Sequence, residues 1–218
     1  MSDGGLSFIH RFEPADLPAT QPILLLHGTG GNEDDLLPLG RMVAPRSALL
    51  SPLGKVRENG MPRFFRRVSM GVFDEDDVRA RANDLADFVE QACKVYDLAA
   101  PIALGYSNGA NVAAAVLLLR PAILSGAILL RATVPFAQPP RTALAGTPVL
   151  ILSGATDPMI SADGGARLAT ALKASGAEVT QRTLPVGHEL SQADVSLARA
   201  WLQERETDAV RRPAARTI

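Results

Sequence analysis

The chain has little of several features that mark particular classes of protein. It has one cysteine, Cys93, which excludes an internal disulfide, and only 5% of its 218 residues are aromatic. The charges of its 22 basic and 23 acidic residues nearly cancel. We therefore do not expect the basic surface with interspersed aromatic residues that is typical of a nucleic-acid-binding protein. Apolar runs are shorter than a membrane span, and the first residues lack the pattern of a signal peptide. We expect a cytoplasmic protein with neither nucleic acid nor membrane as a partner.

Histidine is also scarce, which narrows the chemistry that the chain can perform. The three histidines are His10, His27 and His188. No group of His, Cys, Asp and Glu residues has the spacing of a metal site, so we expect no metal ion. Any general base that relies on an imidazole must be one of these three residues.

Apolar runs alternate with helical patterns along most of the chain. The runs at 23–26, 127–130 and 148–152 are continuous, as in strands that a parallel sheet buries on both faces. Alternation of strands with helices predicts a mostly parallel, doubly wound α/β sheet of about seven strands with flanking helices. We expect 1–204 to form a single domain of this kind and the polar segment 205–218 to be a disordered tail.

The motif Gly105-Tyr106-Ser107-Asn108-Gly109 lies between an apolar run at 101–104 and an Ala-rich stretch at 110–119. A serine flanked by glycines at a strand-to-helix turn is typical of a nucleophile elbow. The glycines let the strand and the helix approach closely, and the strained turn exposes the serine Oγ at the carboxyl edge of the sheet. Ser107 is therefore the candidate nucleophile.

A nucleophilic serine needs a base, and the base needs an acid to orient it. His188 follows the last predicted strand, at the edge where Ser107 is expected, whereas His10 lies in an apparent edge strand. Asp157 follows the strand at 148–152, whereas Asp163 suits a helix start and Asp194 lies inside the final predicted helix. The order Ser107, Asp157, His188 along the chain is the order found in α/β-hydrolases.

The Gly-rich segment 27–32 follows the strand at 23–26. In a hydrolase the amide after the nucleophile and one from such a loop hold the oxyanion, which assigns the N–H groups of Asn108 and Thr29 to that task. The competing interpretation is a phosphate-binding loop, but the segment lacks the spacing and the lysine of a Walker motif, and it has no G-x-G-x-x-G.

The segments 25–32, 105–110, 154–158 and 187–188 together resemble the phospholipase/carboxylesterase family of small α/β-hydrolases, over about residues 20–204. The resemblance implies the α/β-hydrolase fold and cofactor-free hydrolysis of short-chain carboxylic esters or thioesters. It also implies a triad of Ser107, Asp157 and His188. Many relatives have Gln and Gly where this chain has Asn108 and Ala110, which favours the bacterial serine esterase branch over acyl-protein thioesterases.

The segment 53–73 has no clear period, and long excursions of this kind are often functional. We expect it to rim the site without regular structure. Its candidates for substrate contact are Arg57, Met61, Phe64 and Phe65. The other arginines, Arg63, Arg66 and Arg67, have two interpretations: they attract an anionic substrate, or they pair with the acids at 74–77.

The pattern as a whole predicts a serine carboxylesterase that acts on a small-molecule ester through an acyl-enzyme on Ser107. Two alternatives remain. The same triad could hydrolyse a thioester or a small lactone, and a protein of this fold could bind a ligand without turnover. The sequence also leaves open whether the chain forms a homodimer.

Overall fold

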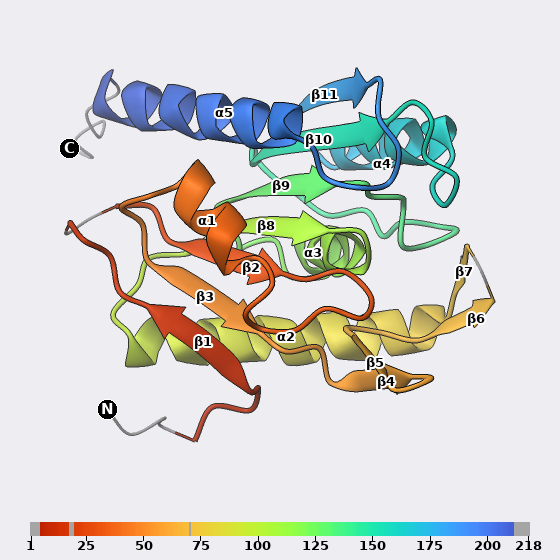
Figure 1. Ribbon diagram of the computed structural model, residues 1–218, viewed down its shortest axis with the longest axis horizontal. Helices are drawn as coiled ribbons and strands as arrows, with labels where there is room; N and C mark the ends of the chain where they lie inside the picture. Colours follow the sequence, from red (N-terminus) through yellow and green to blue (C-terminus); the bar gives the residue numbers. More distant parts are fainter. Residues whose placement is uncertain (1–4, 18–19, 70, 212–218) are drawn as a thin grey trace.

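The computed structural model describes residues 5–17, 20–69 and 71–211 and is built on a seven-stranded sheet (Figure 1). The strand order is β1-β3-β2-β8-β9-β10-β11, and β1 alone runs antiparallel to its neighbour. The strands of this sheet are β1 (His10–Glu13), β2 (Ile23–Leu26), β3 (Leu49–Pro52), β8 (Ile102–Tyr106), β9 (Gly126–Leu130), β10 (Pro148–Gly154) and β11 (Glu178–Leu184). This confirms the predicted sheet of about seven mostly parallel strands.

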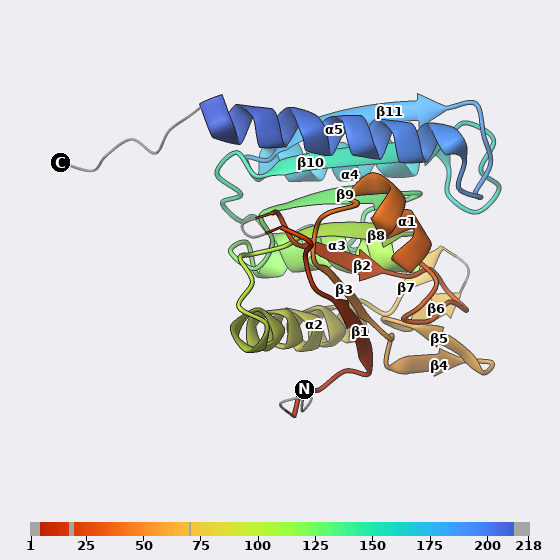
Figure 2. The same cartoon turned by 60° about the vertical axis from the view of Figure 1, so that its left-hand side comes forward.

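Helices cover both faces of the sheet, as Figures 1 and 2 show. Three of them, α2, α3 and α4, pack in one core cluster, and α1 and α5 pack in the other. The helices are α1 (Leu37–Val43), α2 (Glu75–Val95), α3 (Asn108–Leu119), α4 (Ala162–Ala174) and α5 (Gln192–Arg211). The three-layer arrangement explains why the central strands β2, β8 and β9 are buried along nearly their whole length, whereas the edge strands β1 and β11 carry polar residues.

Strand β2 illustrates how one apolar run serves both faces. Leu24 and Leu26 belong to the cluster with α2, α3 and α4, whereas Ile23 and Leu25 belong to the cluster with α1 and α5. Alternate side chains of a strand point to opposite faces, so a strand between two helix layers needs an apolar residue at every position. All four residues are at most 1% exposed.

The 53–73 excursion is more regular than expected. It forms two antiparallel hairpins, β4 (Val56–Glu58) with β5 (Met61–Arg63), and β6 (Arg67–Ser69) with β7 (Val72–Phe73). Asn59 and Gly60 join β4 to β5 with φ values of 51° and 80°. Asn-Gly is a strong signal for such a turn, but three-residue strands are too short to show an alternating pattern. The prediction of a segment without regular structure was wrong.

Helix α1 begins at Leu37, with Pro38 in its first turn, where a missing amide hydrogen is tolerated. The end of helix α5 differs from the expectation. Helix α5 extends to Arg211, so the predicted tail is helical over 205–211. That part contains two arginines, one glutamate and one alanine, all good helix formers, and it has no proline or glycine. The rest of the predicted tail, 212–218, lies outside the described residues.

Candidate active site

Ser107 lies at the turn between β8 and α3, the strand-to-helix position of a nucleophile elbow. Its φ of 53° and ψ of −113° are a strained combination for a residue other than glycine. The turn is crowded: a Cβ at Gly105 would lie 2.7 Å from the Ala110 backbone, and one at Gly109 would lie 2.0 Å from the Leu26 carbonyl oxygen. Glycine is therefore required on both sides of the serine.

His188 lies between the Ser107 hydroxyl and the Asp157 carboxylate. Its Nε2 is 3.0 Å from Ser107 Oγ, and its Nδ1 is 2.8 Å from Asp157 Oδ2. His188 comes from the loop after β11 and Asp157 from the loop after β10, so the ends of three strands supply the three side chains. The structure thus brings together the serine, aspartate and histidine that the sequence singles out.

The Asp157 carboxylate is held from two sides. Oδ2 accepts from His188, and Oδ1 accepts from the backbone amides of Met159 at 2.8 Å and Ile160 at 3.0 Å. Burial raises the pKa of Asp157, but the hydrogen bonds from His188 and from the two amides outweigh burial and leave the pKa below its ordinary value. Asp157 is therefore ionised at neutral pH and fixed in orientation.

The other acidic candidates lie elsewhere. Asp163 is exposed in the first turn of α4, where a negative charge interacts favourably with the helix dipole. Asp194 is buried in the first turn of α5 and pairs with Arg131 at 2.8 Å. Neither carboxylate contacts His188 in the described structure, so Asp157 alone holds that imidazole.

The two remaining histidines make other contacts. On β1, the His10 ring nitrogens hydrogen-bond to the Phe8 carbonyl and the Tyr96 hydroxyl. His27 is 1% exposed and accepts the Gly54 amide hydrogen at Nε2, with its Nδ1 2.7 Å from the Gly28 carbonyl. It therefore ties the segment after β2 to the base of the excursion. Burial lowers the pKa of His27, so the ring is neutral at neutral pH.

Replacing His27 with glutamine is expected to flatten the pH dependence of stability between pH 7 and 5. Below about pH 6.5 an unfolded histidine takes up a proton, whereas buried His27 resists protonation, so the free energy of unfolding falls as the pH falls. Glutamine keeps an acceptor for the Gly54 amide but does not titrate. Urea unfolding of both proteins at pH 7 and 5 measures the difference, and equal slopes would disprove this account.

The predicted oxyanion donors come from two separate segments of the chain. Asn108 is the first residue of α3, where helix geometry leaves an amide without an intrahelical acceptor. Thr29 is exposed in the loop after β2, and the next residue, Gly30, has φ 87° and donates its amide to the Pro62 carbonyl at 2.9 Å. Within the described residues neither the Thr29 nor the Asn108 amide donates to a protein acceptor. Both N–H groups are thus available to a ligand.

The Asn108 side chain has a structural partner. It is 3% exposed, and its Oδ1 accepts the Phe64 amide hydrogen at 2.7 Å. This bond attaches the excursion to the start of α3, next to Ser107. The carbonyl of Pro62 on β5 meanwhile holds Gly30. The β4–β5 hairpin therefore bridges the two loops that carry the predicted oxyanion donors.

The four predicted substrate contacts occupy different environments. Phe65 is completely buried and packs edge-on against Phe73, which places it in the core. Phe64 is 3% exposed and packs against the His27 ring. Met61 is 41% exposed, and its sulfur lies beside Gly30 in the loop after β2. Arg57 is exposed on β4.

The other arginines of the excursion pair with carboxylates. Arg66 contacts Asp74 at 3.1 Å and Asp77 at 3.6 Å, as the surface interpretation predicts. Arg63 and Arg67 instead share Glu58, at 2.6 and 2.8 Å. The sequence does not show this sharing, because the hairpin turn is what brings β4 and the following segments together.

Two residues near the histidine were not assigned from the sequence. Tyr106 donates its hydroxyl hydrogen to the His188 carbonyl at 3.1 Å, and Arg131 donates to the neighbouring Gly187 and Glu189 carbonyls. Tyr106 is the last residue of β8, and Arg131 directly follows β9, so both lie at the carboxyl edge of the sheet. A charged residue directly after the apolar run 127–130 was the available signal for Arg131.

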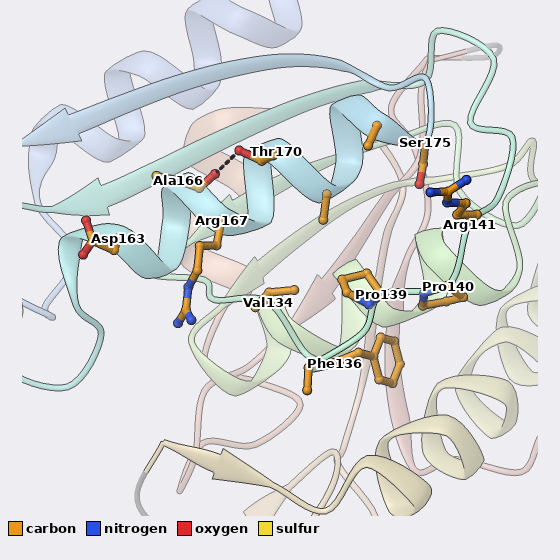
Figure 3. A pocket seen from close by; sticks show the side chains of 13 residues that line it. Val134, Phe136, Pro139, Pro140, Arg141, Asp163, Ala166, Arg167, Thr170 and Ser175 are labelled. Carbon is orange, nitrogen blue, oxygen red and sulfur yellow. Dashed lines mark hydrogen bonds between the residues drawn. The ribbon is translucent and has the colours of Figure 1, made fainter.

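A separate groove of about 870 Å³ lies between α4 and the segment after β9. Figure 3 shows Val134 and Arg167 toward one end and Ser175 and Arg141 toward the other. Its wall is largely apolar, and its lining residues do not include Ser107, Asp157 or His188. The groove is therefore distinct from the hydrogen-bonded serine, histidine and aspartate.

Two further features concern the described residues only. No group of three or more His, Cys, Asp and Glu side chains is arranged there to hold a metal ion. In the same residues, no helix is long and apolar enough to cross a membrane.

Comparison with known proteins identifies relatives that span most of the chain. The model of the phospholipase/carboxylesterase family matches residues 9–205. The putative hydrolase MhqD of Bacillus subtilis is 45% identical over 184 residues, which are 84% of this chain and 92% of that protein.

Solved structures agree with the sequence relatives. A Bacillus cereus carboxylesterase superposes with a TM-score of 0.89 at 40% identity, covering 92% of this chain and 95% of its own. A Mesorhizobium loti carboxylesterase superposes with a TM-score of 0.87 at 34% identity, covering 93% and 97%. These relatives confirm the predicted α/β-hydrolase fold and the prediction of an enzyme of the ester-hydrolase class. The chain belongs to the phospholipase/carboxylesterase family of α/β-hydrolases.

Proposed function

We propose that this protein is a serine carboxylesterase that hydrolyses short-chain or small aryl carboxylic esters through an acyl-enzyme on Ser107. The observation that carries the proposal is the continuous hydrogen-bond chain from Ser107 Oγ through His188 to Asp157, with distances of 3.0 and 2.8 Å. The strained backbone of Ser107 supports it, because the strain holds the hydroxyl at the end of that chain.

In the acylation step, the Ser107 oxygen attacks the ester carbonyl as its proton moves to His188 Nε2. The ionised Asp157 stabilises the resulting imidazolium, because its carboxylate faces Nδ1. The amides of Thr29 and Asn108 donate hydrogen bonds to the oxyanion that forms. His188 then gives the proton to the departing alkoxide, the ester C–O bond breaks, and an alcohol leaves.

Deacylation repeats these roles with water as the nucleophile. His188 takes a proton from water, and the hydroxide oxygen attacks the acyl carbon on Ser107. The same two amides stabilise the second oxyanion. Collapse breaks the bond to Ser107 Oγ, which recovers its proton from His188, and a carboxylic acid leaves.

The acyl group is proposed to be short. Phe64 and Phe65 are buried and therefore do not offer a surface to the substrate. This leaves exposed Met61 as the apolar contact beside the loop that carries Thr29, with Arg57 on the neighbouring strand. Burial of one substrate methylene group contributes about 0.8 kcal/mol, which raises kcat/KM roughly fourfold. This gain requires that the protein enclose the methylene group. A rim contact such as Met61 encloses few methylene groups.

A series of p-nitrophenyl esters tests this proposal. We expect kcat/KM to be highest for acetate to butyrate and to gain nothing from hexanoate to dodecanoate. Met61→Ala should lower kcat/KM for butyrate by about threefold without changing the acetate value. A roughly fourfold rise for each added methylene up to dodecanoate would contradict a short-chain site.

The closest alternative activity is hydrolysis of a thioester or a small lactone by the same groups. An ethyl ester and an ethyl thioester of the same acyl group distinguish ester from thioester hydrolysis, because both substrates form the same acyl-enzyme and differ only in the leaving group. We expect the higher kcat/KM for the ester. A preference of more than about tenfold for the thioester would reassign the substrate class and leave the Ser107 mechanism intact.

A further inference from the structure

Arg131 is a charged residue in an unusual place. It directly follows β9, is 0% exposed, and has φ 55°, a conformation that residues other than glycine rarely adopt. A buried guanidinium in a strained backbone position is costly unless its hydrogen bonds are satisfied. The acceptors of the Arg131 side chain therefore indicate why an arginine is buried at this position.

All five N–H groups of Arg131 have an acceptor. Its two terminal nitrogens pair with the two Asp194 oxygens, each at 2.8 Å. The other donors reach three backbone carbonyls: Nε contacts Gly187 at 3.0 Å, Nη2 contacts Glu189 at 2.9 Å, and Nη1 contacts Leu152 at 3.3 Å. Two of these three carbonyls flank His188 directly.

The carbonyl of His188 itself is held by another side chain. The Tyr106 hydroxyl donates to it at 3.1 Å, and the two rings lie 5.4 Å apart. Three successive carbonyls, of residues 187, 188 and 189, are thus bound by two side chains from the carboxyl ends of β8 and β9. Because both strands are buried in the sheet, they offer a rigid base for the loop between β11 and α5.

Asp194 fixes the far side of the same loop. It is 1% exposed, and besides Arg131 it accepts from the Ser191 amide and hydroxyl, both at 2.8 Å. Burial raises the pKa of Asp194, and its hydrogen bonds with Arg131 and Ser191 lower it to below the ordinary value. The carboxylate is therefore ionised. This carboxylate links the start of α5 to Arg131, so the loop between β11 and α5 is also restrained at its α5 end.

We infer that Arg131 and Tyr106 are positioning residues that hold the His188 loop by its backbone and so set the distance between His188 Nε2 and Ser107 Oγ. The inference rests on the proposed function. Neither side chain is assigned a proton or a contact with the reacting atoms. Displacement of a catalytic group by about 1 Å can cost roughly 100-fold in rate, so the loop requires such a restraint.

The test is a double variant, Arg131→Met with Asp194→Asn. It removes both buried charges together, so neither charge is left unpaired, and the new amide oxygen still accepts from Ser191. Methionine fills the space of the arginine stem but cannot donate to the Gly187 and Glu189 carbonyls. We expect a folded protein whose kcat on p-nitrophenyl acetate falls by about 10- to 100-fold with KM within about threefold. The rate of fluorophosphonate labelling should fall by the same factor.

A matched control removes a similar pair far from this loop. Arg120 and Asp87 form an exposed ion pair between α3 and α2, at 2.8 Å. The double variant Arg120→Met with Asp87→Asn loses the same charges, and we expect its kcat to match that of the unmodified protein. A fall in kcat of similar size in both double variants would contradict the inference, because the effect would then not be specific to the loop.

Tyr106→Phe decides the question if the Arg131 double variant does not fold. It removes one hydroxyl and one donor to the His188 carbonyl, so we expect kcat to fall by about three- to tenfold with unchanged KM. Unchanged kcat in this variant, or in a folded Arg131 double variant, would overturn the inference. If Ser107→Ala keeps its activity in the same assay, the proposed function fails instead.

Discussion

Replacing Ser107 with alanine is expected to lower kcat/KM for p-nitrophenyl acetate by about 10⁴- to 10⁶-fold. Without Oγ no acyl-enzyme forms, and His188 has no proton to take from the protein. The remaining activity would come from the oxyanion amides acting on attack by water. Initial-rate measurements at high enzyme concentration would determine how much activity remains.

The fold should survive this change. The Ser107 hydroxyl bonds to His188 in the described structure, and its loss costs at most about 1 kcal/mol of unfolding free energy. Alanine keeps the Cβ, so the strained turn meets no new contact. A matched control is Ser153→Ala on β10, because the buried Ser153 hydroxyl has no hydrogen-bond partner among the described residues. The control should keep full activity, whereas turnover by Ser107→Ala at the control's rate would refute the assignment.

Replacing Asp157 with asparagine should lower kcat by about 10³- to 10⁴-fold. The backbone amides of Met159 and Ile160 donate to Oδ1, so they would keep the carbonyl oxygen of the new side chain in that place. Its NH₂ group would then face His188 Nδ1 and force that nitrogen to accept. Nε2 would carry the proton and could not take one from Ser107.

The same substitution is expected to change the response of stability to acid. The folded-state pKa of Asp157 is lowered, so the carboxylate stabilises the fold above its unfolded pKa of about 3.9, and that contribution disappears as the pH falls through the folded value. The variant should therefore lose less stability than the unmodified protein on acidification. Thermal unfolding of both proteins from pH 6 to pH 3 measures this difference in stability. For the catalytic role of Asp157, the deciding measurement is kcat at pH 7, and full kcat in the variant would rule that role out.

The three-residue constellation is predictable from the sequence because each member follows a recognisable strand. Ser107 comes directly after β8, whereas Asp157 and His188 lie in the short loops after β10 and β11. Parallel strands place their carboxyl ends at one edge of the sheet. The shortage of histidine narrows the choice of general base, because the sequence offers only three. In the structure the other two, His10 and His27, bond to Tyr96 and to the Gly54 amide. Strand order and register, by contrast, come from pairings between distant segments that periodicity does not encode.

Arg131 shows what local pattern cannot predict. Its position after the apolar run 127–130 marks the end of a strand, but its partners Gly187, Glu189 and Asp194 lie more than 50 residues further along the chain. Local pattern therefore does not reveal that Arg131 forms a buried ion pair. The excursion gives a similar lesson. Its Asn59-Gly60 turn is a local signal, but the burial of Phe65 depends on Phe73 and on the core beneath it.

The most direct test of the central claim is reaction with a fluorophosphonate probe, followed by intact-mass measurement and peptide mapping. A serine activated by His188 attacks the phosphorus and displaces fluoride, which leaves one stable adduct. We predict one adduct per chain, on Ser107, with loss of esterase activity in proportion to labelling and no adduct in Ser107→Ala. Folded protein that resists labelling, or full activity in completely labelled protein, would contradict the claim that Ser107 is the catalytic nucleophile.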